Sequence, residues 1–230
     1  MGMIINPYRF GASSLLTNLV SWWSLNETSG ARGDAHGSNS LTEGGTVNSA
    51  AAKISLGTSN AGGANYLYKD TSSGLAGRAT DYSLSGWVYT TSAATLQAVI
   101  GNAFTFSSID YFLLINTSKL QFYVNQGATN LHAEATTFGT VPSNTWMHVY
   151  CEYNGVTDTI GISVNNGTKN TAAGPASPNT VNDRFSLGYQ QPASRYLLGQ
   201  MDEWGFWSRL LTTDERTSLY NSGNGIGYPG

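Results

Sequence analysis

Short runs of alternating apolar and polar residues constrain the fold of this chain more than any other feature. A period of two places alternate side chains on a buried and an exposed face, as a half-buried β-strand requires. The clearest run spans residues 81–89, where one face would carry Tyr82, Leu84, Gly86 and Val88 and the other Ser83, Ser85 and Trp87. The same pattern predicts strands over residues 109–115, 119–124, 146–153, 159–164, 184–189 and 198–207.

The segments between these strands favour antiparallel connections. Residues 116–118 (Asn-Thr-Ser) fit a hairpin loop, and Asn154-Gly155 is a strong hairpin-turn signal. Strands do not alternate with helix-length segments, which argues against a parallel nucleotide-binding sheet. Short, regularly spaced strands with turn signals between them predict an all-β sandwich or jelly roll.

One short helix is expected near the C-terminal end of the sequence. Thr212 and Glu215 have the spacing of a capping box, in which each side chain bonds the other residue's backbone N–H. Leu219 and Tyr220 end the apolar stripe, and Gly223 suits the residue after the helix.

Composition narrows the classes of partner. Only 11% of the 230 residues are charged, against roughly 25% in a typical globular domain, so neutral polar groups must cover the surface. The net charge is −3 and the 11 Lys and Arg residues are scattered, which argues against a nucleic-acid partner. Cys151 is the single cysteine, so no intrachain disulfide can form, and the inert, buried state is expected for it.

The N-terminal residues are predicted to form an arm ahead of one domain. Residues 1–17 precede the first strand and read as an arm or attachment segment, and residues 18–230 read as the domain. Residues 1–10 do not resemble a signal peptide. No apolar stretch approaches the roughly 20 residues that span a bilayer.

Four stretches resemble laminin-G-like domains of the concanavalin A-like lectin/glucanase superfamily. The first covers residues 19–27 (LVSWWSLNE), with the turns Ser29-Gly30 and residues 34–37 (DAHG). The second is residues 82–88 (YSLSGWV), and the third is residues 144–149 (NTWMHV) with the turns near residues 153–155 and 164–167. The fourth is residues 199–204 (GQMDEW), followed by Trp207 and residues 211–223.

The resemblance covers roughly residues 19–225 and implies a two-sheet antiparallel jelly roll with one short C-terminal helix. It does not determine the function, because this fold hosts lectins, hydrolases, adhesion modules and structural parts. Many laminin-G-like domains hold a calcium ion near the first turn, and the matching position here is Asp34. The resemblance thus implies one structural calcium, with ligands at Asp34, Asn39 and Asp202; the alternative is that Asp34 and Asp202 bond turn amides.

The sequence predicts no catalytic residues. Glycosidases need two carboxyl groups on either side of the scissile bond, whereas Asp202 and Glu203 are adjacent and are expected on opposite faces of a strand. The three histidines lie in unrelated contexts, with His148 expected to pack in a sheet, and no Gly-x-Ser-x-Gly elbow occurs. A glucanase is therefore only a distant alternative.

Aromatic residues are the best candidates for binding a ligand, because rings can pack on the apolar faces of sugars. Four tryptophans fall at positions expected to be packed: Trp23, Trp87, Trp146 and Trp207. Trp22 and Trp204 lie on the opposite strand faces and are expected to be more exposed. The candidate ligand-binding residues are Trp22, Tyr66, Tyr68, Tyr189 and Tyr196, and Tyr111 lies in a similar context.

These observations predict a non-enzymatic, lectin-like binding module at a virion surface or outside a cell. Residues 4–11 (IINPYRFG) look like the start of a virion-associated protein, and Ile5, Tyr8, Arg9 and Phe10 are expected to contact a partner. Expected partners are glycans or cell-surface material, other virion proteins and further copies of this chain. A purely structural particle protein without a glycan ligand is the alternative.

Overall fold

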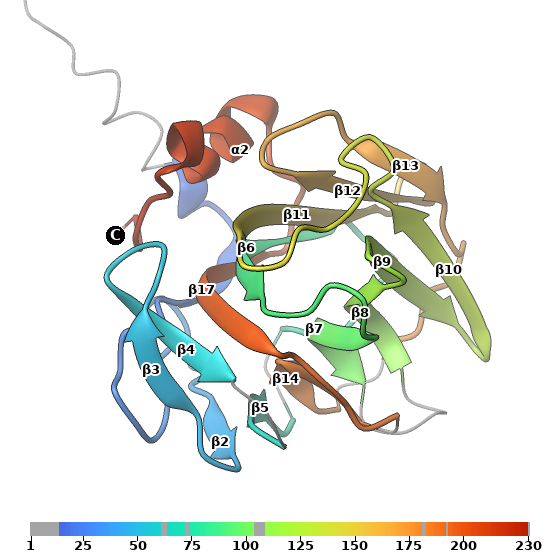
Figure 1. The fold of residues 1–230 in the computed structure, drawn as a ribbon. Coiled ribbons are helices and arrows are strands. Elements are labelled where there is room, and N and C mark those ends of the chain that lie inside the picture. Colours follow the sequence, from blue (N-terminus) through green and yellow to red (C-terminus); the bar gives the residue numbers. More distant parts are fainter. Residues whose placement is uncertain are drawn as a thin grey trace, which may run out of the picture.

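The computed structural model describes residues 14–60, 64–71, 74–103, 109–180, 183–191 and 193–229, and they form two antiparallel sheets packed face to face (Figure 1). The predicted all-β sandwich with one C-terminal helix is confirmed. The predicted contact residues Ile5, Tyr8, Arg9 and Phe10 lie outside the described residues. Within the described part of the chain, no helix has the length and hydrophobicity of a bilayer-spanning segment.

The eight-stranded sheet is built around β17 (Gly199–Trp207) and β6 (Tyr82–Thr90). On the β6 side follow β11 (Trp146–Asn154), β12 (Thr159–Val164) and β13 (Asn170–Ala173). On the other side of β17, β4 (Leu56–Asn60) pairs with its first part and leads to β3 (Asn48–Ala51), while β1 (Leu19–Trp23) pairs with its second part.

The second sheet consists of seven strands in one path from edge to edge. It begins with β10 (Thr129–Glu134), β9 (Lys119–Gln126), β8 (Ile109–Asn116) and β7 (Gln97–Ala103). It continues with β14 (Phe185–Leu187), β5 (Tyr66–Lys69) and β2 (Thr42–Gly44). A small hairpin, β15 (Tyr189–Gln190) with β16 (Arg195–Tyr196), lies against β7. The strand expected over residues 184–189 is thus divided at Gly188, which has a positive φ of 80°.

The core between the sheets forms from the alternation seen in the sequence. Tyr82, Leu84 and Val88 of β6 enter the core as expected, and Trp23 stacks on Phe185 across it at 4.9 Å. Cys151 is buried there too, and burial raises the pKa of its thiol well above the usual value. Burying apolar surface contributes about 25 cal/mol per Å² and is the main stabilising term for such a sandwich.

The tryptophan predictions hold only in part. Trp23, Trp87 and Trp207 are buried as expected, whereas Trp146 is only half-buried. The expectation that Trp204 is exposed is wrong: it is fully buried in the core, and its indole N–H donates to the Trp87 carbonyl oxygen at 3.1 Å. The Trp204 ring packs directly on Gly86, because a Cβ atom at this position would lie only 2.3 Å from the indole.

Helix α2 (Thr213–Tyr220) begins with the predicted capping box. The backbone N–H of Glu215 donates to Thr212 Oγ1 at 3.2 Å, and that of Thr212 donates to Glu215 Oε2 at 2.8 Å. The C-terminal cap is Asn221 in the left-handed region, with a φ of 46°, rather than Gly223, which ends the short 3-10 helix η1 (Asn221–Gly223). Asparagine tolerates this conformation better than most residues, so it can replace glycine here.

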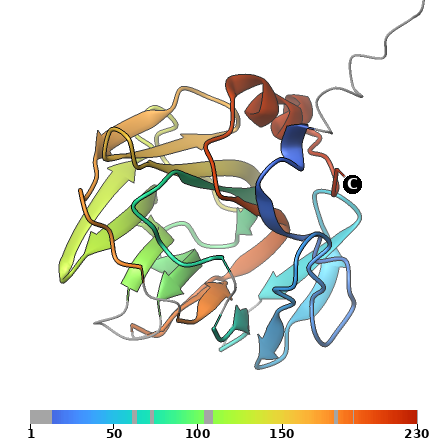
Figure 2. The same cartoon turned by 180° about the vertical axis from the view of Figure 1, so that it is seen from behind.

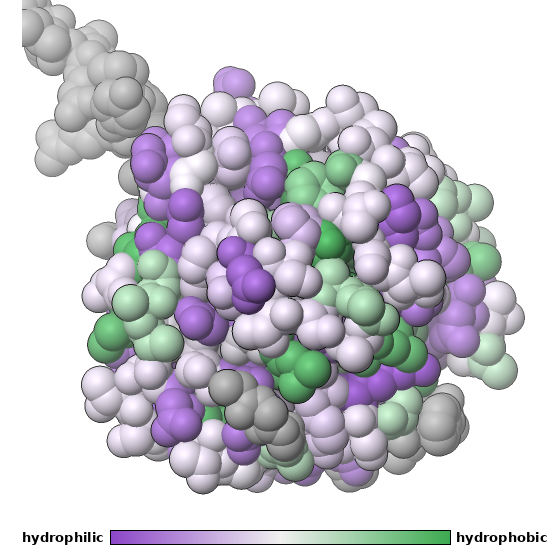
Figure 3. Space-filling model, viewed as in Figure 1, coloured by the Kyte–Doolittle hydropathy of each residue, from purple (hydrophilic) through white to green (hydrophobic). Residues whose placement is uncertain are grey.

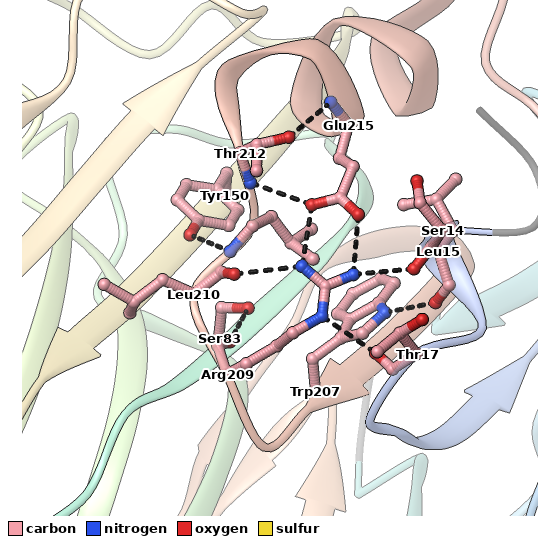
Figure 4. A network of polar contacts seen from close by, with 11 residues as sticks. Ser14, Leu15, Thr17, Ser83, Tyr150, Trp207, Arg209, Leu210, Thr212 and Glu215 are labelled. Atoms are coloured by element: carbon pink, nitrogen blue, oxygen red, sulfur yellow. Dashed lines mark hydrogen bonds and ion pairs between the residues drawn. The ribbon is translucent and has the colours of Figure 1, made fainter. Parts of the chain in front are cut away.

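Arg209 joins the first described residues to the helix (Figure 4). Its guanidinium makes two hydrogen bonds of 2.7 Å with Glu215 and also donates to the backbone carbonyl oxygens of Ser14 and Thr17 at 2.8 Å. Leu15 is fully buried, and its carbonyl oxygen accepts the Trp207 indole N–H at 2.7 Å. Residues 14–17, which the sequence assigns to the arm, therefore pack on the domain beside α2, as the blue segment in Figure 2 shows.

Candidate functional site

One row of paired residues crosses the outer face of the seven-stranded sheet. Paired residues in antiparallel strands project to the same face. This row faces away from the core, because the neighbouring residues Leu67, Leu113 and Phe122 are core members. From β10 to β2 the row consists of His132, Tyr123, Phe112, Gly101, Ser186, Tyr68 and Thr42.

Three rings at one end of this row stack on each other. The Phe112 and Tyr123 ring centres lie 4.5 Å apart at 15°, and those of Tyr123 and His132 lie 4.6 Å apart at 28°. The Tyr123 hydroxyl donates to Gln121 Oε1 at 2.7 Å, and Gln121 Nε2 donates to Glu134 Oε2 at 2.7 Å. The rings thus form a fixed apolar wall with a polar network beside it.

A pocket of about 190 Å³ opens against this wall, and we call it the face pocket. Pockets for drug-sized ligands measure roughly 300–1,000 Å³, so this volume suits a single small ring. Its exposed rim includes Leu96, which is 41% exposed. The face pocket is lined by Leu96, Phe112, Leu114, Asn116, Tyr123, Asn130 and Arg195.

Arg195 comes to the face pocket from the β15–β16 hairpin. Its Nη1 donates to Gln190 Oε1 at 2.9 Å, and Gln190 is only 3% exposed. A buried amide therefore positions one side of the guanidinium. The face pocket combines apolar walls with a few fixed polar groups, which is the composition of small-molecule sites.

Four of the predicted ligand-binding residues meet beside this hairpin and form the tyrosine cluster: Tyr66, Tyr68, Tyr189 and Tyr196. Tyr189 stacks on both Tyr66 at 4.2 Å and Tyr196 at 4.8 Å, and Tyr68 lies 5.7 Å from Tyr66. A Cβ atom at Gly44 would come within 2.3 Å of the Tyr66 ring, so this glycine packs on the far side of that ring. Tyr189 is buried and the other three rings are half-buried, and the cluster supports the hairpin that carries Arg195.

A paired arginine completes the tyrosine cluster. The Arg184 guanidinium lies 4.3 Å from the Tyr68 ring centre and bonds both carboxylate oxygens of Asp70, at 2.6 and 3.1 Å. Burial, followed by the neighbouring Tyr196, raises the pKa of Tyr189 to about 12, so the Tyr189 hydroxyl is uncharged at neutral pH. The predicted similar role of Tyr111 is wrong: that ring is fully buried, and its hydroxyl donates to the Leu75 carbonyl oxygen at 2.7 Å.

Trp22 does not lie on this surface, and its predicted exposure is wrong. It is 1% exposed on the outer side of the eight-stranded sheet, among Trp207, Leu211 and Leu219. Its indole N–H donates to Glu203 Oε2 at 2.5 Å. The C-terminal segment after α2 covers this region, where Ile226 and Tyr228 pack on the same apolar cluster.

The expectation that Asp202 and Glu203 point to opposite faces is also wrong. The register between β17 and β6 shifts between Asp202 and Gly205, and Glu203 has a φ of 48°. This bulge turns both carboxyl groups to the outer side, where Asp202 accepts the Ile54 backbone N–H at 2.6 Å. Burial raises the pKa of Asp202 to about 7 and that of Glu203 to about 8.

Asp34 organises the first turn. Its Oδ1 accepts backbone N–H groups of Trp22, His36 and Gly37 at 2.8–3.1 Å, and its Oδ2 accepts that of Asn39 at 2.9 Å. Burial raises the pKa of Asp34, but these amide bonds outweigh it and lower the pKa overall. The Asn39 side chain donates to Ser21 Oγ at 2.8 Å and is buried. The alternative that Asp34 and Asp202 bond turn amides is therefore what the geometry shows.

The predicted calcium ligands come together only in part. No three His, Cys, Asp or Glu side chains of the described residues are grouped as a metal site, so Asp34 does not join the adjacent Asp202 and Glu203. A pocket of about 210 Å³ lies beside Asp34 and Glu27, and Glu27 Oε2 is buried without a hydrogen-bond partner among the described residues. Two carboxylates at one pocket fit a hard cation, whose charge they would balance. Calcium at Asp34 stays a prediction, and Glu27 is a candidate ligand that was not predicted from the sequence.

The chain belongs to the concanavalin A-like lectin/glucanases superfamily, because the model of that laminin G-type family matches residues 60–215. No curated protein matches the sequence. Domain 4 of AbnA, a GH43 extracellular arabinanase from Geobacillus stearothermophilus solved with arabinotriose, is similar with a TM-score of 0.66 and 17% identity, over 91% of this chain and 98% of that one.

Two toxin domains have the same fold over half of their length. The binding domain of Paraclostridial Mosquitocidal Protein 1 has a TM-score of 0.72 and 14% identity, over 91% of this chain and 53% of that one. The botulinum neurotoxin serotype D binding domain has a TM-score of 0.68 and 12% identity, over 90% and 52%. This chain thus spans about half the length of these toxin domains.

Proposed function

We propose that this protein is a non-enzymatic glycan-binding module that holds one sugar ring in the face pocket. The observation that carries the proposal is the pocket itself, where stacked rings form an apolar wall beside two amides and a positioned guanidinium. Sugars present apolar C–H faces and hydroxyl groups together, and such a lining complements both. The arabinotriose complex of the similar arabinanase domain supports a sugar ligand for this fold.

The burial of the two carboxyl groups on β17 supports the absence of glycosidase chemistry. Asp202 is fully buried and Glu203 is 4% exposed, and each already bonds a protein N–H group. A glycosidase acid must reach the glycosidic oxygen, and a second carboxylate must reach the anomeric carbon or a water. Buried against other protein groups, this pair does neither.

The similar domain of an extracellular arabinanase supports a role outside the cell. Figure 3 shows hydrophobic residues in small, separated groups among pale neutral and purple polar ones. We place the module at an extracellular or virion surface, where its partners are glycans or particle proteins. The virion setting rests on residues 4–11, and deleting residues 3–11 should then change assembly state or particle attachment; unchanged behaviour removes that setting.

Glycan binding is tested on a glycan array and then by calorimetry with the sugars that bind. Leu96 and Val156 are both exposed apolar residues, at 41% and 86%, but only Leu96 lines the face pocket. We expect Leu96→Ala and Tyr123→Ala to weaken binding at least several-fold and Val156→Ala to leave it unchanged. A folded protein that binds no sugar on the array would refute the proposal and favour the alternative, a structural particle protein without a glycan ligand.

A further inference from the structure

The lining of the face pocket carries one charged side chain, Arg195. Of the six arginines that the structure describes, Arg32, Arg184 and Arg209 each pair with a carboxylate within 4 Å, whereas Arg78, Arg195 and Arg216 form no such pair with a described residue. Of these last three, only Arg195 lines the face pocket, and the lining contains no Asp or Glu. The outer-face acid Glu134 accepts a hydrogen bond from Gln121 instead.

The position of Arg195 is fixed before any ligand arrives. The buried Gln190 amide holds its Nη1, and the tyrosine cluster supports the hairpin that carries it. Its charge acts on the wall of the pocket: burial raises the pKa of the Tyr123 hydroxyl, Asn116 and then Arg195 lower it, and Glu134 has a smaller effect in the raising direction. A guanidinium held in this way loses little freedom when it binds, which favours a charged hydrogen bond to a ligand.

We propose that the sugar taken by the face pocket is an acidic one, whose carboxylate pairs with Arg195 while its ring packs on Phe112 and Tyr123. This inference rests on the proposed glycan-binding function and adds the class of sugar. Guanidinium and carboxylate match in geometry and charge, so the pair is stronger than a hydrogen bond to a neutral hydroxyl. Asn116 and Asn130 are available at the rim for the remaining hydroxyl groups.

The experiment compares sugars that differ only in this charge. Calorimetry would measure trigalacturonic acid and sialyllactose, each against its own carboxyl methyl ester, so that uronic and sialic acids are distinguished. We expect at least one acid to bind about tenfold or more tightly than its neutral counterpart. Arg195→Gln should remove this preference and Arg195→Lys should keep part of it. Arg216→Gln is the matched control, because it removes the same charge from α2, which covers the other sheet, and should preserve the preference.

The outcomes separate this inference from the proposed function. If acid and ester bind equally, or if R195Q keeps the preference while folded by circular dichroism, the pocket binds sugars but the acidic class is wrong. If no sugar binds, or if sugars bind and Leu96→Ala and Tyr123→Ala leave the affinity unchanged, both proposals fail.

Discussion

Glu203 shows how one backbone angle decides the chemistry of a pair of side chains. In a regular strand, Asp202 and Glu203 would face opposite sides of the sheet. The bulge, with Glu203 at a φ of 48°, places both on the outer side, where Asp202 bonds the Ile54 backbone N–H and Glu203 bonds the Trp22 indole N–H. Both carboxyl groups are therefore buried, and burial raises both pKa values.

This burial predicts a dependence of stability on pH. The pKa of Glu203 rises from 4.5 to about 8 on folding, so between these values the folded state keeps a proton that the unfolded chain has lost. The free energy of unfolding should then fall as pH rises from about 4.5 to about 8 and level off above it. Glu203→Gln removes this titration while keeping an oxygen for the Trp22 indole. We expect the difference in free energy of unfolding between this variant and the wild type to grow in the variant's favour by about 2–4 kcal/mol from pH 4 to pH 9, measured by urea unfolding.

Asp202→Asn provides the second measurement. The pKa of Asp202 rises from 3.8 to about 7 on folding. The stability of this variant relative to the wild type should therefore also increase with pH, over the lower range from about 3.8 to about 7. Stability curves of the wild type and both variants that run parallel across pH would show that the two carboxyl groups ionise freely in the folded state.

At the scale of elements, strands and caps were predictable because their signals are local. Alternation in residues 81–89 located β6, and Thr212 with Glu215 located the start of α2. The residues of the face pocket lie on β8, β9, β10, β16 and the segment before β7. Only the register of the β8–β9 hairpin could place Phe112 next to Tyr123 from the sequence. Arg195 reaches the pocket through an irregular hairpin over β7, for which the sequence carries no periodic signal.

The loop that follows β1 carries a revised metal prediction, in which Glu27 joins Asp34 in place of the expected Asn39 and Asp202. If calcium binds at Glu27 and Asp34, about 10 mM calcium should raise the melting temperature by a few degrees, given the roughly 0.1–1 mM affinity of extracellular modules. A chelator should reverse the change and Glu27→Gln should abolish it, while Glu43→Gln serves as the control. The same melting temperature in excess calcium and in chelator would remove this site.

At the scale of the whole molecule, the two ends of the described chain close the sandwich together. Leu15 fills the apolar cluster under α2, and Arg209 binds the carbonyl oxygens of Ser14 and Thr17 while it pairs with Glu215. The first and last elements therefore stabilise each other across nearly the full length of the sequence. Neither contact carries a local signal, so the sequence pattern placed the domain boundary after residue 17.

Two truncations measure what this closure contributes. Removing residues 1–13 leaves every one of these contacts in place, whereas removing residues 1–17 deletes the buried Leu15 and exposes the Arg209–Glu215 pair. We expect the longer truncation to unfold with about 3–5 kcal/mol less free energy than the shorter one, from one buried leucine and several hydrogen bonds. Leu15→Ala in the full chain should account for about 2–4 kcal/mol of this difference, because it removes the side chain and keeps the backbone contacts. Equal melting temperatures for the two truncations would mean that residues 14–17 do not stabilise the sandwich. The domain would then begin after residue 17, as the sequence predicts.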